Sequence, residues 1–158
     1  MKDDTESPDN ASPSSARREL TKVEIKESVD NHARWVRSNG EEGQAADFQK
    51  AQLKGVVFMG ANLRQANFAE AYLYGAYLKN TNLENANLEN ANLRGANLRW
   101  ANLKNANLKN ANLMRADFQE ADMENTQLQG ANLKMSVGLT REQLEKAQVD
   151  ETTVLPPA

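Results

Sequence analysis

The chain of 158 residues holds few side chains that could do chemistry, and none of them forms a set with catalytic spacing. Its one histidine, His32, has no second histidine and no cysteine with which to build a nucleophilic triad or a usual zinc site. We therefore expect His32 to be a packed or capping side chain. A cluster of carboxylates could in principle hold a hard cation, although solvated surface carboxylates are the favoured interpretation: Asp117, Glu120, Asp122 and Glu124. The sequence predicts a protein that is not an enzyme and has no cofactor or metal site.

Composition and charge limit the cellular compartments and partners expected for the chain. It has no cysteine, which suits a reducing compartment, and no run of about 18 apolar residues that could cross a bilayer. The N-terminus lacks the apolar centre of a secretory signal, so we expect a cytoplasmic protein without a membrane partner. The net charge is −3, yet residues 46–135 carry ten basic and eight acidic side chains, a balance of +2, so the acidity lies in the flanks.

A five-residue pattern repeats 18 times without interruption between Ala46 and Met135: a small residue, a short polar residue, a leucine and two variable residues. The first position is Ala 15 times, and the third is Leu 13 times, Phe four times and Met once. Two positions that accept only small or apolar side chains must face a core. A helix would scatter this repeat around its axis, and a flat strand would invert it at every pentad. The pattern predicts an all-β solenoid in which the chain turns a corner at each pentad and every coil bonds to the next.

The A(N/D)LXX pattern resembles the pentapeptide-repeat family over residues 46–135, as in ANLENANLRGANLRWANLKNANL. The resemblance implies a right-handed quadrilateral β-helix with four pentads per coil and with Leu, Phe and Ala facing inward. The flanks are similar as well. HARWVRSNGEEGQAADF resembles the helical lead-in of many bacterial members, and GLTREQLEKAQVDETTVLPP resembles their closing segment.

The flanking segments predict a helix at each end. Thr21 with Glu24, and Thr140 with Gln143, have the spacing of capping boxes, and the second of these begins a short helix over residues 141–147. We expect a disordered tail at 1–19, a capping helix and loop at 20–45, the β-helix at 46–135, and a capping helix and tail at 136–158. Lids at both ends favour a monomer, with a homodimer as the alternative.

Residues 20 apart should stack, so the variable positions form four outward columns. One column alternates in charge and is expected to be a solvated wall: Arg64, Glu84, Lys104 and Glu124. Two adjacent columns instead collect the side chains that break the polar rule of the repeat, and these form the candidate partner-binding face: Val57, Met59, Tyr72, Tyr74, Tyr77, Lys79, Arg94, Arg99 and Trp100. Exposed aromatic, Met and Arg side chains are typical of interface cores. The alternative is that they are tolerated surface residues that stack on one another, with a cation–π pair between Tyr74 and Arg94.

These observations favour a non-catalytic structural module, a rigid β-helical scaffold that presents an aromatic and basic face to a protein partner. The alternative comes from the resemblance: some pentapeptide-repeat proteins mimic a DNA duplex and modulate a type II topoisomerase, DNA gyrase. Mimicry of that kind requires a consistently acidic rod, whereas these repeats are slightly basic. Direct nucleic-acid binding is disfavoured too, because the basic side chains circle the rod and no reader motif occurs.

Overall fold

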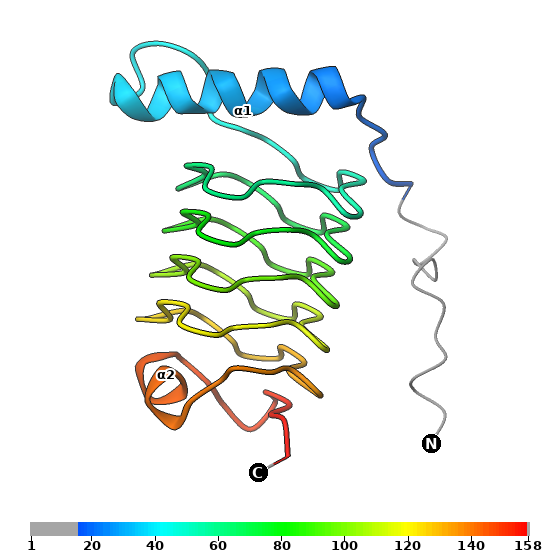
Figure 1. The fold of residues 1–158 in the computed structure, drawn as a ribbon, viewed down its shortest axis with the longest axis vertical. Helices are drawn as coiled ribbons and strands as arrows, with labels where there is room; N and C mark the ends of the chain where they lie inside the picture. Colours follow the sequence, from blue (N-terminus) through cyan, green and yellow to red (C-terminus); the bar gives the residue numbers. More distant parts are fainter. Residues whose placement is uncertain (1–15, 158) are drawn as a thin grey trace.

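The computed structural model describes residues 16–157 and shows a stack of coils with a helix at each end (Figure 1). Helix α1 spans Lys22–Arg37 and lies across the first coil, and helix α2 spans Arg141–Lys146 beside the last. The β-pairing of the described residues consists of single-residue parallel bridges. Such short pairings fit a chain that bends after every few residues.

Each coil contains four pentads. Parallel bridges join residues 20 apart, from Asp47 with Asn67 down to Asp117 with Val137. The stack therefore has four walls, each named here after the first residue bridged within it: the Asp47, Gln52, Val57 and Asn62 walls. The four-pentad coil expected from the resemblance is present.

The interior is filled by the first and third positions of the pentads. Leu63, Ala66 and Phe68, for example, are fully buried. Three phenylalanines fill the first two coils, with ring centroids 5.2 to 6.1 Å apart: Phe48, Phe58 and Phe68. Burial of one such apolar side chain contributes about 1.5–3 kcal/mol, so the columns of Leu and Phe supply most of the driving force for coiling.

The corners explain the other positions of the pentad. The fifth residue adopts a positive φ, as in Asn80 (59°) and Gly95 (70°), and this conformation favours glycine and asparagine. The second residue is usually Asn or Asp because its side-chain oxygen accepts a hydrogen bond from the backbone two residues on. Asn92, for example, accepts from the Arg94 N–H at 3.0 Å.

Helix α1 begins with the capping box expected at Thr21 and Glu24, in which both reciprocal bonds are present. Its Ile25 and Val29 pack against the core, together with Leu20 just before the helix. Farther along the helix, His32 is fully buried. The helix thus contributes both apolar side chains and one polar side chain to the upper end of the stack.

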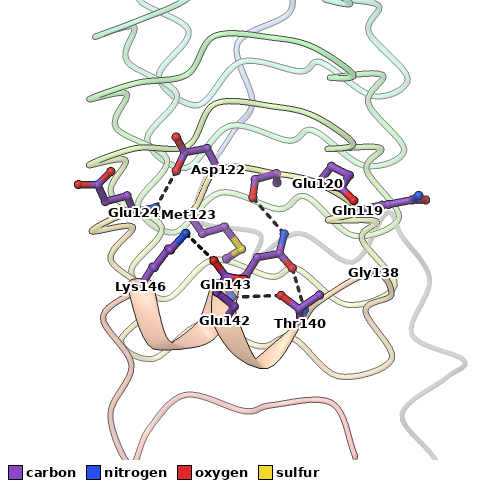
Figure 2. A pocket seen from close by; sticks show the side chains of 11 residues that line it. Gln119, Glu120, Asp122, Met123, Glu124, Gly138, Thr140, Glu142, Gln143 and Lys146 are labelled. Carbon is purple, nitrogen blue, oxygen red and sulfur yellow. Dashed lines mark hydrogen bonds and ion pairs between the residues drawn. The ribbon is translucent and has the colours of Figure 1, made fainter.

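Helix α2 is held against the last full coil by Gln143, whose side-chain N–H donates to the carbonyls of Phe118 (2.9 Å) and Ala121 (3.0 Å). Figure 2 shows Gln143 directed from α2 towards that coil. The chain then returns beneath the stack, where Gln148 and Val154 bridge the lowest pentads. The end of the stack is therefore covered by hydrogen-bonded chain on two of its walls and by α2 on a third.

One expectation about the N-terminal segment is wrong in part. Residues 16–19 were expected to belong to a disordered tail, but Arg18 bridges Ala51 on the Gln52 wall. Its N–H donates to the Lys50 carbonyl, and its own carbonyl accepts from the Gln52 N–H, both at 2.8 Å. The rest of that expectation, residues 1–15, lies outside the described residues. In residues 16–157 no helix has both the length and the apolar character needed to cross a membrane.

Candidate interaction surface

The Val57 wall exposes four large apolar side chains towards its upper end: Val57 (66% exposed), Met59 (53%), Tyr77 (50%) and Trp100 (45%). Val57 bridges Tyr77 in the next coil, so the two side chains lie one above the other on the same wall. Trp100 is the fifth residue of its pentad in the third coil, and its φ of 55° places it at a corner. These residues are the exposed apolar part of the face predicted from the sequence.

Two cations of the predicted face lie over one ring. The Lys79 ammonium is 5.2 Å from the centroid of Trp100, and the Arg99 guanidinium is 5.3 Å from it. Arg99 also approaches Asp117 in the coil below, at 3.9 Å between Nε and Oδ2. Asp117 therefore offsets part of the Arg99 charge.

The Gln52 wall differs from the expectation at one residue. Tyr72 is only 2% exposed, and the Arg17 guanidinium lies 3.7 Å above its ring. Tyr72 therefore contributes almost nothing to an accessible face. The residue that covers it, Arg17, belongs to the segment that was expected to be a disordered tail. Tyr74 stacks on Tyr72 with centroids 6.1 Å apart, and its cationic neighbour is Lys54 at 5.8 Å, whereas the alternative interpretation had paired it with Arg94.

Pentads that lack a side-chain acceptor at the second position lose a hydrogen bond at the corner. Every pentad has a side-chain acceptor at its second position for the backbone N–H two residues on, except four, whose second residues are Val57, Tyr72, Tyr77 and Gln127. Among residues 16–157, nothing accepts from the N–H of Met59 or Lys79. A turn hydrogen bond of this kind is worth about 0.5–1.5 kcal/mol, so each departure lowers the stability of its corner.

The Asn62 wall, which follows the Val57 wall around each coil, is charged. On the Asn62 wall the expected alternation includes one close pair, Lys104 with Glu124 at 3.5 Å. Such exposed pairs contribute about 0–1 kcal/mol, and this wall offers no exposed large apolar side chain in the described residues. Within residues 46–135 the exposed large apolar side chains lie on the Val57 wall, apart from Met135 on the Gln52 wall.

The comparisons with known proteins agree with this architecture. The family model for pentapeptide repeats, with 8 copies, matches residues 44–76, 58–95, 71–110 and 96–134. The chain belongs to the pentapeptide repeat family. Members of this family form right-handed β-helices. No curated protein matches the sequence.

Three solved structures of pentapeptide repeat proteins are similar to the chain. A protein of the Arabidopsis thaliana thylakoid lumen is 34% identical, with a TM-score of 0.54, over 63% of this chain and 69% of that one. HetL, involved in heterocyst differentiation regulation in Nostoc sp. PCC 7120, is 34% identical, with a TM-score of 0.43, over 71% of this chain and 56% of that one. A protein of the cyanobacterium Cyanothece 51142 is 33% identical, with a TM-score of 0.42, over 68% and 69%. None of the comparisons indicates an enzymatic family.

A lysine of α2, Lys146, lies near the carboxylates at the end of the pentapeptide repeats. Figure 2 shows the surface between α2 and the last full coil, where Lys146 pairs with Glu142 at 2.9 Å. The pKa of Lys146 is raised, mainly by its hydrogen bond and charge pairing with Glu142, with smaller effects from Asp122 and Glu124. In the described part of the chain no group of three or more His, Asp or Glu side chains could hold a metal ion.

His32 joins helix α1 to the pentapeptide repeats. Its Nδ1 accepts a hydrogen bond from the Ala46 N–H at 2.9 Å. Its Nε2 lies 2.9 Å from the Arg64 carbonyl oxygen. Because Nδ1 accepts, the neutral ring carries its proton on Nε2 and donates to Arg64. Both partners are backbone groups of the first coil, which has no coil above it. The sequence singled out His32 as structural, but its two backbone partners are 14 and 32 residues away and could not be inferred from it.

Proposed function

We propose that this pentapeptide repeat protein is a non-catalytic protein-interaction module whose β-helix presents the upper Val57 wall to a protein partner. The core of the interface is the exposed set on that wall together with its two cations: Val57, Met59, Tyr77, Lys79, Arg99 and Trp100. Tyr74 and Arg94 on the adjacent Gln52 wall extend it. Within this proposal residues 46–135 are the scaffold, and residues 20–45 and 136–158 close its two ends.

One observation carries the proposal: Trp100 is 45% exposed at a left-handed corner, with Lys79 and Arg99 over its ring. A tryptophan in this conformation has no conformational advantage over the asparagine or glycine found at other corners, and it leaves a large apolar ring in water. Tryptophan, tyrosine and arginine are the residues that dominate binding energy in protein interfaces. A surface of this composition gains free energy when a partner covers it.

The partner need not be nucleic acid or a DNA-binding enzyme. The repeats have a net charge of +2, and two of their acidic side chains lie close to bases: Glu124 to Lys104 and Asp117 to Arg99. A mimic of DNA would have to present a continuous acidic surface to a site built for phosphates. Charge therefore favours a protein partner that recognises apolar and cationic groups.

The test is affinity capture from extract of the native cell, with wild-type protein and a Tyr77→Asn, Trp100→Asn double variant as bait. Asparagine is the most frequent residue at both pentad positions, so the variant retains the repeat. We expect a partner that wild type captures and the variant loses. A Glu84→Gln variant on the Asn62 wall is the matched control and should retain it. Capture of the same proteins by all three baits would refute the proposal.

A further inference from the structure

A groove lies between helix α1 and the uppermost pentads of the Gln52 and Val57 walls. Its floor is apolar: Leu53 and Phe58 belong to the buried core, and Ile25 and Val29 face it from the helix. Its outer margin includes the exposed side chains of Val57 and Met59. The groove thus continues the proposed interaction surface to the end of the stack.

The backbone along this groove is an open edge. Below it, Val57 is paired: the Tyr77 N–H donates to the Val56 carbonyl, and the Tyr77 carbonyl accepts from the Phe58 N–H at 2.9 Å. On the upper side, no group among residues 16–157 bonds to the N–H or the carbonyl of Val57, or to the carbonyl of Met59. An edge of this kind is a template for an added strand.

The neighbouring wall shows how such an edge is used. There, Arg18 lies above Ala51, donating to the Lys50 carbonyl and accepting from the Gln52 N–H. The equivalent groups one pentad later are the Gly55 carbonyl and the Val57 N–H, and no described residue bonds to either of them. The same coil therefore has one edge that carries an extended segment and one, with matching geometry, that does not.

The charges around the groove are of one sign. Lys22 and Lys26 line it from the helix and Lys54 from the coil, and no aspartate or glutamate lines it. Lys26 also pairs with Asp30 along the helix at 2.6 Å, whereas Lys22 has no ion pair within the described residues. An occupant with carboxylates beside its apolar side chains would complement this margin.

We propose that this groove binds an extended segment of a protein partner, acidic and apolar in alternation, which adds a parallel strand above Val57. The segment donates one backbone N–H to the Gly55 carbonyl and accepts from the Val57 N–H. Side chains on one face of it enter the groove over Phe58, and those on the other face reach Lys22 and Lys54. The inference rests on the proposed function, since it assigns the place and chemistry of docking on the same wall.

The test uses a display library of random twelve-residue peptides selected on the full-length chain. We expect the enriched peptides to alternate Val, Ile or Phe with Asp or Glu. On addition of a selected synthetic peptide, the Val57 amide should become protected from hydrogen exchange. N-methylation of alternate backbone amides in that peptide should weaken binding about tenfold at the positions that donate to the groove. The Lys22→Glu and Lys54→Glu variants should each weaken it about threefold, as expected for exposed ion pairs.

A Lys109→Glu variant on the Asp47 wall is the matched control and should bind the peptide as wild type does. The proposal is overturned if no peptide family is enriched, if the selected peptides leave Val57 exchange unchanged, or if N-methylation has no effect. It is also overturned if Val57 is already protected without peptide, because another part of this chain or a second copy would then fill the groove. Loss of the native partner in the Trp100→Asn bait, with full retention in Lys54→Glu, would leave the proposed function standing and refute only the strand addition.

Discussion

Replacement of His32 should destabilise the upper end of the stack in a pH-dependent way. The imidazole is fully buried and joins the Ala46 N–H to the Arg64 carbonyl through two bonds of 2.9 Å. In His32→Ala both backbone groups lose their partner, and each buried unsatisfied group costs about 1–3 kcal/mol. The variant should therefore lose about 2–6 kcal/mol, a large fraction of the roughly 5–15 kcal/mol by which a domain is stable.

The pH dependence follows from the direction of the pKa shift. Burial lowers the pKa of His32 below its ordinary value of 6.5, while the bond to the Arg64 carbonyl opposes this in part. The folded chain thus prefers the neutral ring, and the unfolded chain binds more protons just below pH 6.5. The contribution of His32 to stability is complete above that pH and declines as the pH falls from there towards the lowered pKa. Protonation of Nδ1 would also place its N–H against the N–H of Ala46.

The assay is hydrogen exchange of the Ala46 and Phe48 amides, measured between about pH 7.5 and 5 and corrected for intrinsic exchange. A solenoid can open locally at one end, so these amides report the upper coil while Leu93 in the middle serves as an internal reference. His32→Gln, which keeps one donor and one acceptor and does not titrate, should retain protection and lose the pH dependence. Equal protection of Ala46 in wild type and His32→Ala, or an Nδ1-protonated ring by nitrogen NMR, would refute the reasoning.

Three further outcomes are expected. Gly43→Ala should lower the midpoint of thermal unfolding much more than Gly95→Ala: both residues have positive φ, but the new Cβ at Gly43 would lie 2.2 Å from the Asn31 carbonyl oxygen, whereas nothing lies within 4 Å at Gly95. Similar midpoints for the two variants would contradict this. Gln143→Ala should speed exchange in α2, since two carbonyls lose a donor at about 1 kcal/mol each, while the exposed Glu145→Ala should not. Unchanged exchange in Gln143→Ala would show that α2 is held by its apolar contacts alone. In a gyrase supercoiling assay the protein should neither inhibit the enzyme nor protect it from a quinolone, and dose-dependent protection would disprove the charge argument.

The repeat made the fold predictable because the pentad encodes both a core and a corner. A buried Leu63 and an adjacent corner at Gln65 (φ 64°) follow from position within the pentad alone. The spacing of Thr21 and Glu24 likewise predicted the first residue of α1 to be Lys22. In each case the residues that decide the structure are close neighbours in the sequence, so one chain is sufficient to identify them.

Contacts between the flanks and the repeats were not predictable in the same way. Tyr72 was assigned to the exposed face, but Arg17, from a segment with no apolar periodicity, covers its ring. The partners of His32 were missed for the same reason. The approach of Arg99 to Asp117 could have been anticipated, because Asp117 lies 20 residues after Asn97, in the same pentad as Arg99. Stacking fixes neighbours within the repeats, but nothing in the pentad specifies where the flanks lie.

On the Val57 wall, three residues depart from the repeat at a cost to the stability of the fold. Asparagine at positions 57 and 77 would provide the acceptor that the Met59 and Lys79 N–H groups lack, and asparagine at position 100 would suit a left-handed corner. Folding alone therefore favours asparagine at all three places, and each costs the scaffold on the order of 1 kcal/mol relative to it. Because the three side chains share one wall, with Val57 directly above Tyr77, a common cause on that wall explains them better than three unrelated losses. A partner that covers this wall is such a cause, because the free energy of binding offsets the folding stability that the isolated chain lacks.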